Sequence, residues 1–141
     1  MIEIAPVAPG LFTANSSGQG LATALALRVK ANVQQVYEPV AQYDQATGVF
    51  MANPIDLSAP DEQVYLIFFG TGLRYRSSLN AVSLELGGIA ADVLYAGSTP
   101  GLAGLDQVNV LVPNSLAGHG EVEAALTVDG KKANTVKLVF K

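Results

Sequence analysis

Hydrophobic and polar residues alternate with a period of two along most of this chain. The clearest case is segment 105–112, in which Leu105, Gln107, Asn109 and Leu111 fall on one face and Asp106, Val108, Val110 and Val112 on the other. Successive side chains of a strand point to opposite faces of its sheet, so this pattern predicts a β-strand. Pro113 predicts its end, because proline cannot donate to a strand ladder.

The same alternation, or a short apolar run, predicts further strands between turn signals. They are expected at 2–4, 21–29, 33–43, 49–52, 63–69, 82–86, 89–95, 121–128 and 133–140. Segment 63–69 is the most hydrophobic and is predicted as a central strand, whereas Pro39 marks 33–43 as an edge or a bulge. Asp129-Gly130 predicts a tight hairpin. About nine or ten short strands, spaced by turn signals, predict an antiparallel, immunoglobulin-like β-sandwich.

The length of 141 residues predicts a single domain over 1–141, in which the strands of 1–62 pack on the part formed by 63–141. One face of each strand is expected to enter a common core. Its predicted members are Phe12, Leu25, Leu27, Tyr65, Ile67, Phe69, Leu84, Leu86, Val93, Val108, Val110, Leu126, Val128, Leu138 and Phe140.

Composition narrows the classes of partner. Only 14% of the residues are charged and the net charge is −4, which argues against a surface that follows a nucleic-acid backbone. No apolar run approaches the ~20 residues of a membrane helix, so membrane insertion is not expected. The start of the chain, Met1-Ile2-Glu3, has neither the basic region nor the long apolar stretch of a signal peptide.

The residues that usually carry catalysis or bind metals are scattered. There is no cysteine, which excludes a disulfide framework, a thiolate zinc site and a cysteine nucleophile. His119 is the single histidine and lies between two glycines. The loop acids that could bind calcium do not form a dense cluster; they are Asp44, Asp56, Asp61 and Glu62. The sequence therefore predicts no enzyme activity, no cofactor and no metal site.

Aromatic residues offer one candidate recognition surface. It consists of Tyr37, Tyr43 and Tyr75, the last lying between Arg74 and Arg76. Tyrosine combines an apolar ring with a polar tip, as sugar- and protein-binding surfaces require. The alternative is that these are ordinary, half-buried tyrosines of a sandwich.

Several short motifs together resemble a known family. They are P-G-L-F-T at 9–13, G-Q-G at 18–20, G-T-G-L at 70–73, Y-A-G at 95–97, P-G at 100–101, G-L-D-Q-V-N-V at 104–110 and V-P at 112–113. The chain is similar to the immunoglobulin-like, plexin, transcription-factor (IPT/TIG) sandwich modules. It resembles more closely a family of uncharacterised C-terminal domains in large secreted acidobacterial proteins. Asp106 stands where this resemblance predicts an aromatic residue.

The resemblance implies an exported module, secreted or at the cell surface, that is attached to a larger protein. We expect a non-catalytic structural or adhesive role through protein–protein contacts, made by the sheet edges at 2–4 and near Pro39. These contacts would join other domains of a longer chain or further copies. The alternative is a carbohydrate-binding module that uses Tyr37, Tyr43 or Tyr75.

Overall fold

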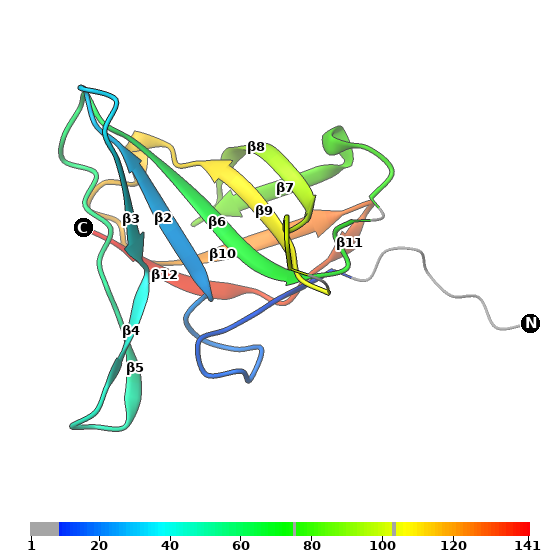
Figure 1. Cartoon of the computed structure of the whole chain (residues 1–141), viewed down its shortest axis with the longest axis horizontal. Coiled ribbons are helices and arrows are strands. Elements are labelled where there is room, and N and C mark those ends of the chain that lie inside the picture. The colour runs from blue at the N-terminus through cyan, green and yellow to red at the C-terminus, as the bar shows by residue number, and fades with distance from the viewer. Residues whose placement is uncertain (1–8, 75, 103) are drawn as a thin grey trace, which may run out of the picture.

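The computed structural model describes residues 9–74, 76–102 and 104–141, whose regular elements are almost all antiparallel strands (Figure 1). The predicted strand at 2–4 lies outside these residues. The strands are β1 (Gly10–Leu11), β2 (Ala24–Val29), β3 (Gln35–Pro39), β4 (Ala41–Asp44), β5 (Val49–Ala52), β6 (Gln63–Thr71), β7 (Val82–Leu86), β8 (Ile89–Ser98), β9 (Asp106–Leu111), β10 (Gly120–Val128), β11 (Lys131–Lys132) and β12 (Val136–Phe140). Two short 3-10 helices, η1 (Leu79–Ala81) and η2 (Asn114–Leu116), precede β7 and β10.

The strands form two layers, which confirms the predicted all-β, antiparallel sandwich. A front sheet has the order β3-β2-β6-β9-β8, and a back sheet contains β7, β10, β11 and β12. Figure 1 looks onto the front sheet, with β10 and β12 behind it. Strand β8 joins the layers, because its first residues pair with β7 and the remainder pairs with β9.

A second connection closes the opposite side of the sandwich. Leu21, just before β2, forms a parallel bridge with Lys137 of β12. Lys137 N donates to Gly20 O at 2.7 Å, and Ala22 N donates to Lys137 O at 3.0 Å. Ile55 forms a second parallel bridge, with Phe140. The outer edge of β12 is therefore covered by two segments from the first half of the chain.

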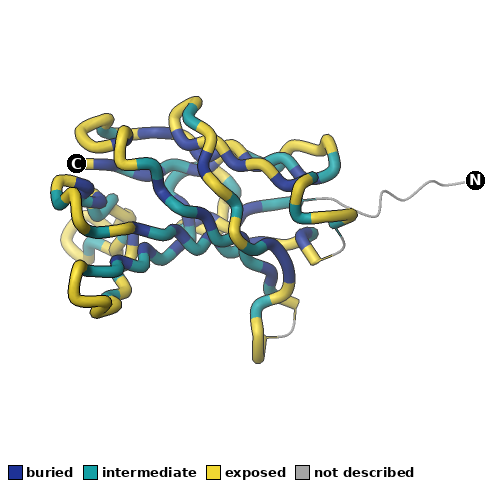
Figure 2. The backbone as a smooth tube through the Cα atoms, turned by 90° about the horizontal axis from the view of Figure 1, so that it is seen from above, coloured by how far each residue is buried: buried dark blue, intermediate teal, exposed yellow. Residues whose placement is uncertain are grey.

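The hydrophobic core lies between the sheets (Figure 2). Leu11 and Ile55 from the first half of the chain join the same cluster as Phe68 and Phe140. The predicted core residues that are buried are Leu84, Leu86, Val108, Val110, Leu126, Val128, Leu138 and Phe140. Val93 is half-buried against this cluster.

The predicted core was wrong for β2 and β6. Leu25, Leu27, Tyr65, Ile67 and Phe69 are half-buried on the outer face of the front sheet, and Phe12 is 40% exposed. The inward positions are filled instead by Ala24 and Ala26 of β2 and by Val64, Leu66 and Phe68 of β6. Strand β6 is apolar on both faces, so alternation alone could not tell which face is inside.

Gly70 is required by a close approach of two backbones. The strand expected at 63–69 continues in the structure to Thr71, and Gly70 pairs with Leu11 of β1. A Cβ atom on Gly70 would lie 2.1 Å from Gly10 O. Any side chain here would therefore push β1 off the sheet.

The predicted Asp129-Gly130 hairpin is confirmed. Val128 pairs with Lys131, and the two residues between them have φ angles of 50° and 77°. Positive φ at both central residues is the requirement of a type I′ turn.

Candidate protein-docking surface

The structure places Tyr37 and Tyr43 at the surface, on two different elements. Tyr37 is 57% exposed on β3, at the edge of the front sheet, and Tyr43 is 55% exposed on β4, outside that sheet. Tyr75 lies outside the described residues. The two described tyrosines are therefore available for recognition, but they do not belong to one sheet.

Arg74 and Arg76 follow the far end of β6 and bond to their own chain. The Arg74 Nε donates to Asp106 Oδ1 at 2.7 Å, and the Arg76 Nε donates to Ala96 O at 2.8 Å. Tyr37 lies at the other end of the sheet, in the row of Leu27 and Tyr65. The structure therefore does not bring these arginines to the tyrosines.

Strand register assembles a different surface, the outer face of the front sheet. One row across it runs Tyr37, Leu27, Tyr65, Leu111, and the next runs Pro39, Leu25, Ile67, Asn109, Tyr95. We call this surface the apolar face. Its apolar and aromatic members are Leu25, Leu27, Tyr37, Tyr65, Ile67, Phe69, Tyr95 and Leu111, all half-buried or exposed, and the uncharged Gln63, Gln107 and Asn109 share the face with them.

The apolar face differs from the outer face of the back sheet. The back sheet presents an ordinary solvated surface that includes Ser83, Glu85, Glu121, Glu123, Thr127 and Lys137. On the front sheet, by contrast, the described strands contribute one charged side chain to the outer face, Asp92, which lies at its rim beside Leu111. An antiparallel sheet normally exposes one polar face to water, whereas this outer face combines apolar side chains with a few uncharged polar ones.

Several polar side chains of the apolar face form hydrogen bonds within it or to its own strands. The Gln107 amide donates to Asn109 Oδ1 at 3.0 Å, and the Tyr65 hydroxyl donates to Gln63 Oε1 at 2.8 Å. The Tyr95 hydroxyl donates to Ser98 O, which lays the ring over Gly97. Covering a polar group costs less when it keeps a hydrogen bond, so this face can lose its water at a modest cost.

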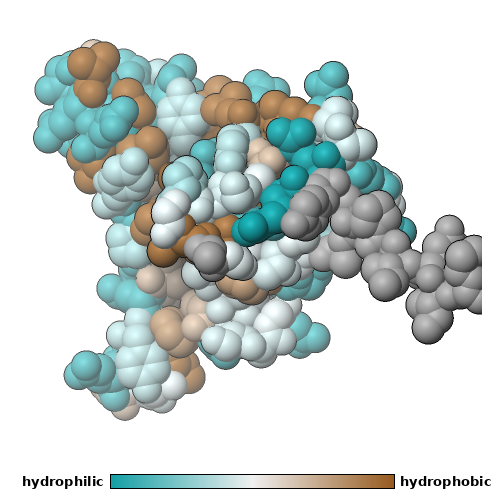
Figure 3. Space-filling model, turned by 45° about the vertical axis from the view of Figure 1, so that its right-hand side comes forward, coloured by the Kyte–Doolittle hydropathy of each residue, from teal (hydrophilic) through white to brown (hydrophobic). Residues whose placement is uncertain are grey.

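The hairpin formed by β4 and β5 is a second apolar element. It extends away from both sheets at the lower left of Figure 1 and pairs with neither of them. Tyr43 and Phe50 stack edge to face at 5.3 Å, and the neighbouring Val49 and Met51 are 54% and 49% exposed. In Figure 3 hydrophobic and hydrophilic residues lie side by side at the lower left, where this hairpin extends. A groove of about 420 Å³ separates its tip from the loop at 14–21.

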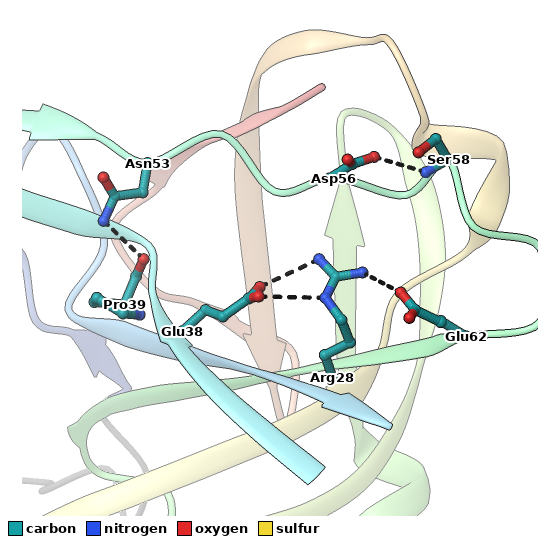
Figure 4. Close-up of polar contacts among 7 residues, drawn as sticks. All are labelled: Arg28, Glu38, Pro39, Asn53, Asp56, Ser58 and Glu62. Carbon is teal, nitrogen blue, oxygen red and sulfur yellow. Dashed lines mark hydrogen bonds and ion pairs between the residues drawn. The ribbon is translucent and has the colours of Figure 1, made fainter. Parts of the chain in front are cut away.

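A charged cluster on the inner side of β2 connects three segments (Figure 4). Arg28, which is 8% exposed, bonds both carboxylate oxygens of Glu38 on β3, at 3.2 and 3.3 Å, and Glu62 before β6 at 3.0 Å. Burial lowers the pKa of the Arg28 guanidinium, but the bonds to Glu38 and Glu62 outweigh burial and leave the pKa raised. The arginine therefore stays charged and acts as a clamp between strands.

The edge near Pro39 offers little room for an added strand. Lys30 N donates to Gln34 O, so these two residues form a hydrogen-bonded pair of the ladder between β2 and β3. Bonded and non-bonded pairs alternate along an antiparallel ladder, so the backbone N–H and C=O groups of Val36 and Glu38 point toward β2. Those of Gln35, Tyr37 and Pro39 lie on the open side of β3. Pro39 has no N–H, and its carbonyl accepts from the Asn53 amide at 3.0 Å (Figure 4). Two residues remain for pairing, which is short for β-augmentation.

The candidates for catalysis and metal binding remain apart. His119 is exposed in the loop after η2. Across 9–74, 76–102 and 104–141, no three His, Cys, Asp or Glu side chains come together as metal ligands. Among the same residues, no helix has the length and apolar character to cross a membrane.

Comparisons of the chain with protein-family models, with curated proteins and with solved structures found no match. The surface must therefore be interpreted from its own residues.

Sequence reasoning missed most of the apolar face, although a signal for it existed. Gln107 and Asn109 mark one face of β9 as outward. Their partners across the sheet, Phe69 and Ile67, must share that face. A prediction that β9 pairs with β6 in this register would therefore have placed Ile67 and Phe69 on the outward face as well.

Proposed function

We propose that this chain is a non-catalytic structural or adhesive module that makes protein–protein contacts through its apolar face. One observation carries the proposal: the outer face of the front sheet carries the half-buried Leu25, Ile67 and Phe69, while the alanines of β2 point inward. Contiguous apolar surface of this kind marks an interaction site on soluble proteins. The motifs that resemble exported acidobacterial C-terminal domains support a secreted or cell-surface location for such a module.

A carbohydrate-binding role is the second candidate. Tyr37, Tyr65 and Tyr95 share the face with the amides of Gln107 and Asn109, and sugars bind to such combinations of rings and amides. The aliphatic centre of the face, formed by Leu25, Leu27 and Ile67, favours protein over sugar. Binding on a glycan array that is lost in Tyr37→Ala and Tyr65→Ala would reverse this ranking.

Site-specific photo-crosslinking in the producing cells tests the proposal. A benzoylphenylalanine in place of Ile67 is expected to give protein adducts on illumination, because it would lie in the contact. The control position is Ala125, which is exposed on the back sheet. Absence of protein adducts from position 67, or equal adducts from both positions, would contradict a contact through the apolar face.

A further inference from the structure

We infer that the apolar face docks onto the same face of a second copy of this chain, in a two-fold symmetric pair. This inference rests on the proposed function and names its partner.

Charge favours this face for contact between identical molecules. The chain carries a net charge of −4, so two copies repel each other over most approaches. Glu85, Glu121 and Glu123 lie on the outer face of the back sheet. The apolar face has Asp92 only at its rim, so two copies can approach there with few like charges opposed.

The size of the face is near the lower limit for a specific dimer. Five strands about 4.8 Å apart, with about three outward residues each, give a footprint on the order of 500 Å² per copy. Two copies would then bury about 1,000 Å², where specific interfaces begin. A weak, reversible dimer is therefore expected rather than an obligate one.

The face is also complementary to itself. Two twisted sheets pack face to face at about 10 Å, with their strands about 30° apart. Such packing needs apolar side chains at the centre of both sheets, and Ile67 of the central strand β6 occupies that position. The bond between Gln107 and Asn109 satisfies one amide donor and one amide acceptor within each copy.

Analytical ultracentrifugation of the full chain tests the inference. The wild type should show a monomer–dimer equilibrium, with a dissociation constant on the order of 10–100 μM for so small an interface. Ile67→Glu and Ile67→Lys should each weaken dimerisation at least about 100-fold, because like charges would meet near the two-fold axis. An equimolar mixture of the two variants should dimerise again, because Glu would then face Lys.

Two controls keep the outcome clear. Ala125→Glu on the back sheet should leave the dissociation constant unchanged. Tyr37→Glu, at an exposed position, should weaken dimerisation about tenfold. If circular dichroism shows that the Ile67 variants do not fold, this variant still tests the inference.

Three results would overturn the inference: a monomeric wild type up to millimolar concentration, a dimer that withstands the face variants, or folded Ile67 variants whose mixture stays monomeric. If the wild type is monomeric but position 67 crosslinks to another protein in cells, the homodimer fails and the proposed function stands. If neither is observed, both fail.

Discussion

At the residue scale, Asp106 shows how one side chain fixes a loop. This carboxylate is 2% exposed and accepts three hydrogen bonds from adjacent residues: Leu73 N at 2.9 Å, Arg74 N at 3.2 Å and Arg74 Nε at 2.7 Å. The segment after β6 is therefore held against β9. An aromatic side chain, which the resemblance predicted here, could not accept these bonds.

Asp106→Asn is expected to lower the free energy of unfolding by about 2–4 kcal/mol, because an amide removes the charge and cannot accept through both of its polar atoms. Urea unfolding measures this loss. The matched control is Glu121→Gln, which weakens an exposed pair with Lys137 at 3.5 Å and should cost no more than about 0.5 kcal/mol. Equal losses in the two variants would contradict the assigned role of Asp106.

Gly70→Ala should destabilise the protein by about 2–3 kcal/mol, because the new methyl group would collide with the backbone of β1. Gly10→Ala is the control on the other strand of the pair, since its methyl group would meet Thr71 Oγ1 at 3.6 Å, an ordinary contact. Thermal denaturation of both variants distinguishes the two positions. A Gly70→Ala protein as stable as Gly10→Ala would show that β1 does not lie where the structure places it.

At the element scale, the hairpin of β4 and β5 should open independently of the sandwich. It pairs with neither main sheet, and an isolated two-stranded hairpin is marginally stable in water. Tyr43→Ala and Phe50→Ala should each speed amide hydrogen exchange within 41–52 and leave the exchange of β6 unchanged. A double-mutant cycle should give a coupling of about 0.5–1 kcal/mol for the aromatic pair. Faster exchange in β6 would contradict this independence.

Alternation predicted where the strands lie in the sequence, but it did not always predict which face of a strand enters the core. In β9 the predicted core residues Val108 and Val110 are buried, and Gln107 and Asn109 occupy the opposite face. In β6 the run from Val64 to Phe69 has apolar or aromatic residues on both faces, so the pattern alone did not decide its orientation. The roles of Arg74 and Asp106 depend on contacts between residues 32 positions apart, which a single sequence does not show.

At the scale of the whole molecule, residues 63–141 should not fold alone. Strand β2 covers β6 along six register pairs, and Leu11, Ala26 and Ile55 belong to the common core. A chain of 63–141 would leave the β2-facing edge of β6 unpaired and would lack these three core residues, so we expect poor dispersion in its NMR spectrum and aggregation. The full chain serves as the control. A well-dispersed spectrum of the fragment would show that the first half only decorates a finished domain.

The parallel closure beside β12 also has a mechanical consequence. The Asn134 side chain bonds Leu11 and Gly18, and the β12 backbone bonds Gly20 and Ala22. Because the segment at 20–22 runs parallel to β12, tension applied between the two ends of the chain loads their hydrogen bonds in shear, and they must rupture together. Single-molecule pulling should therefore give one high force peak for the wild type and a lower one for Asn134→Ala. A module with this pairing would resist a pulling force applied between its two ends.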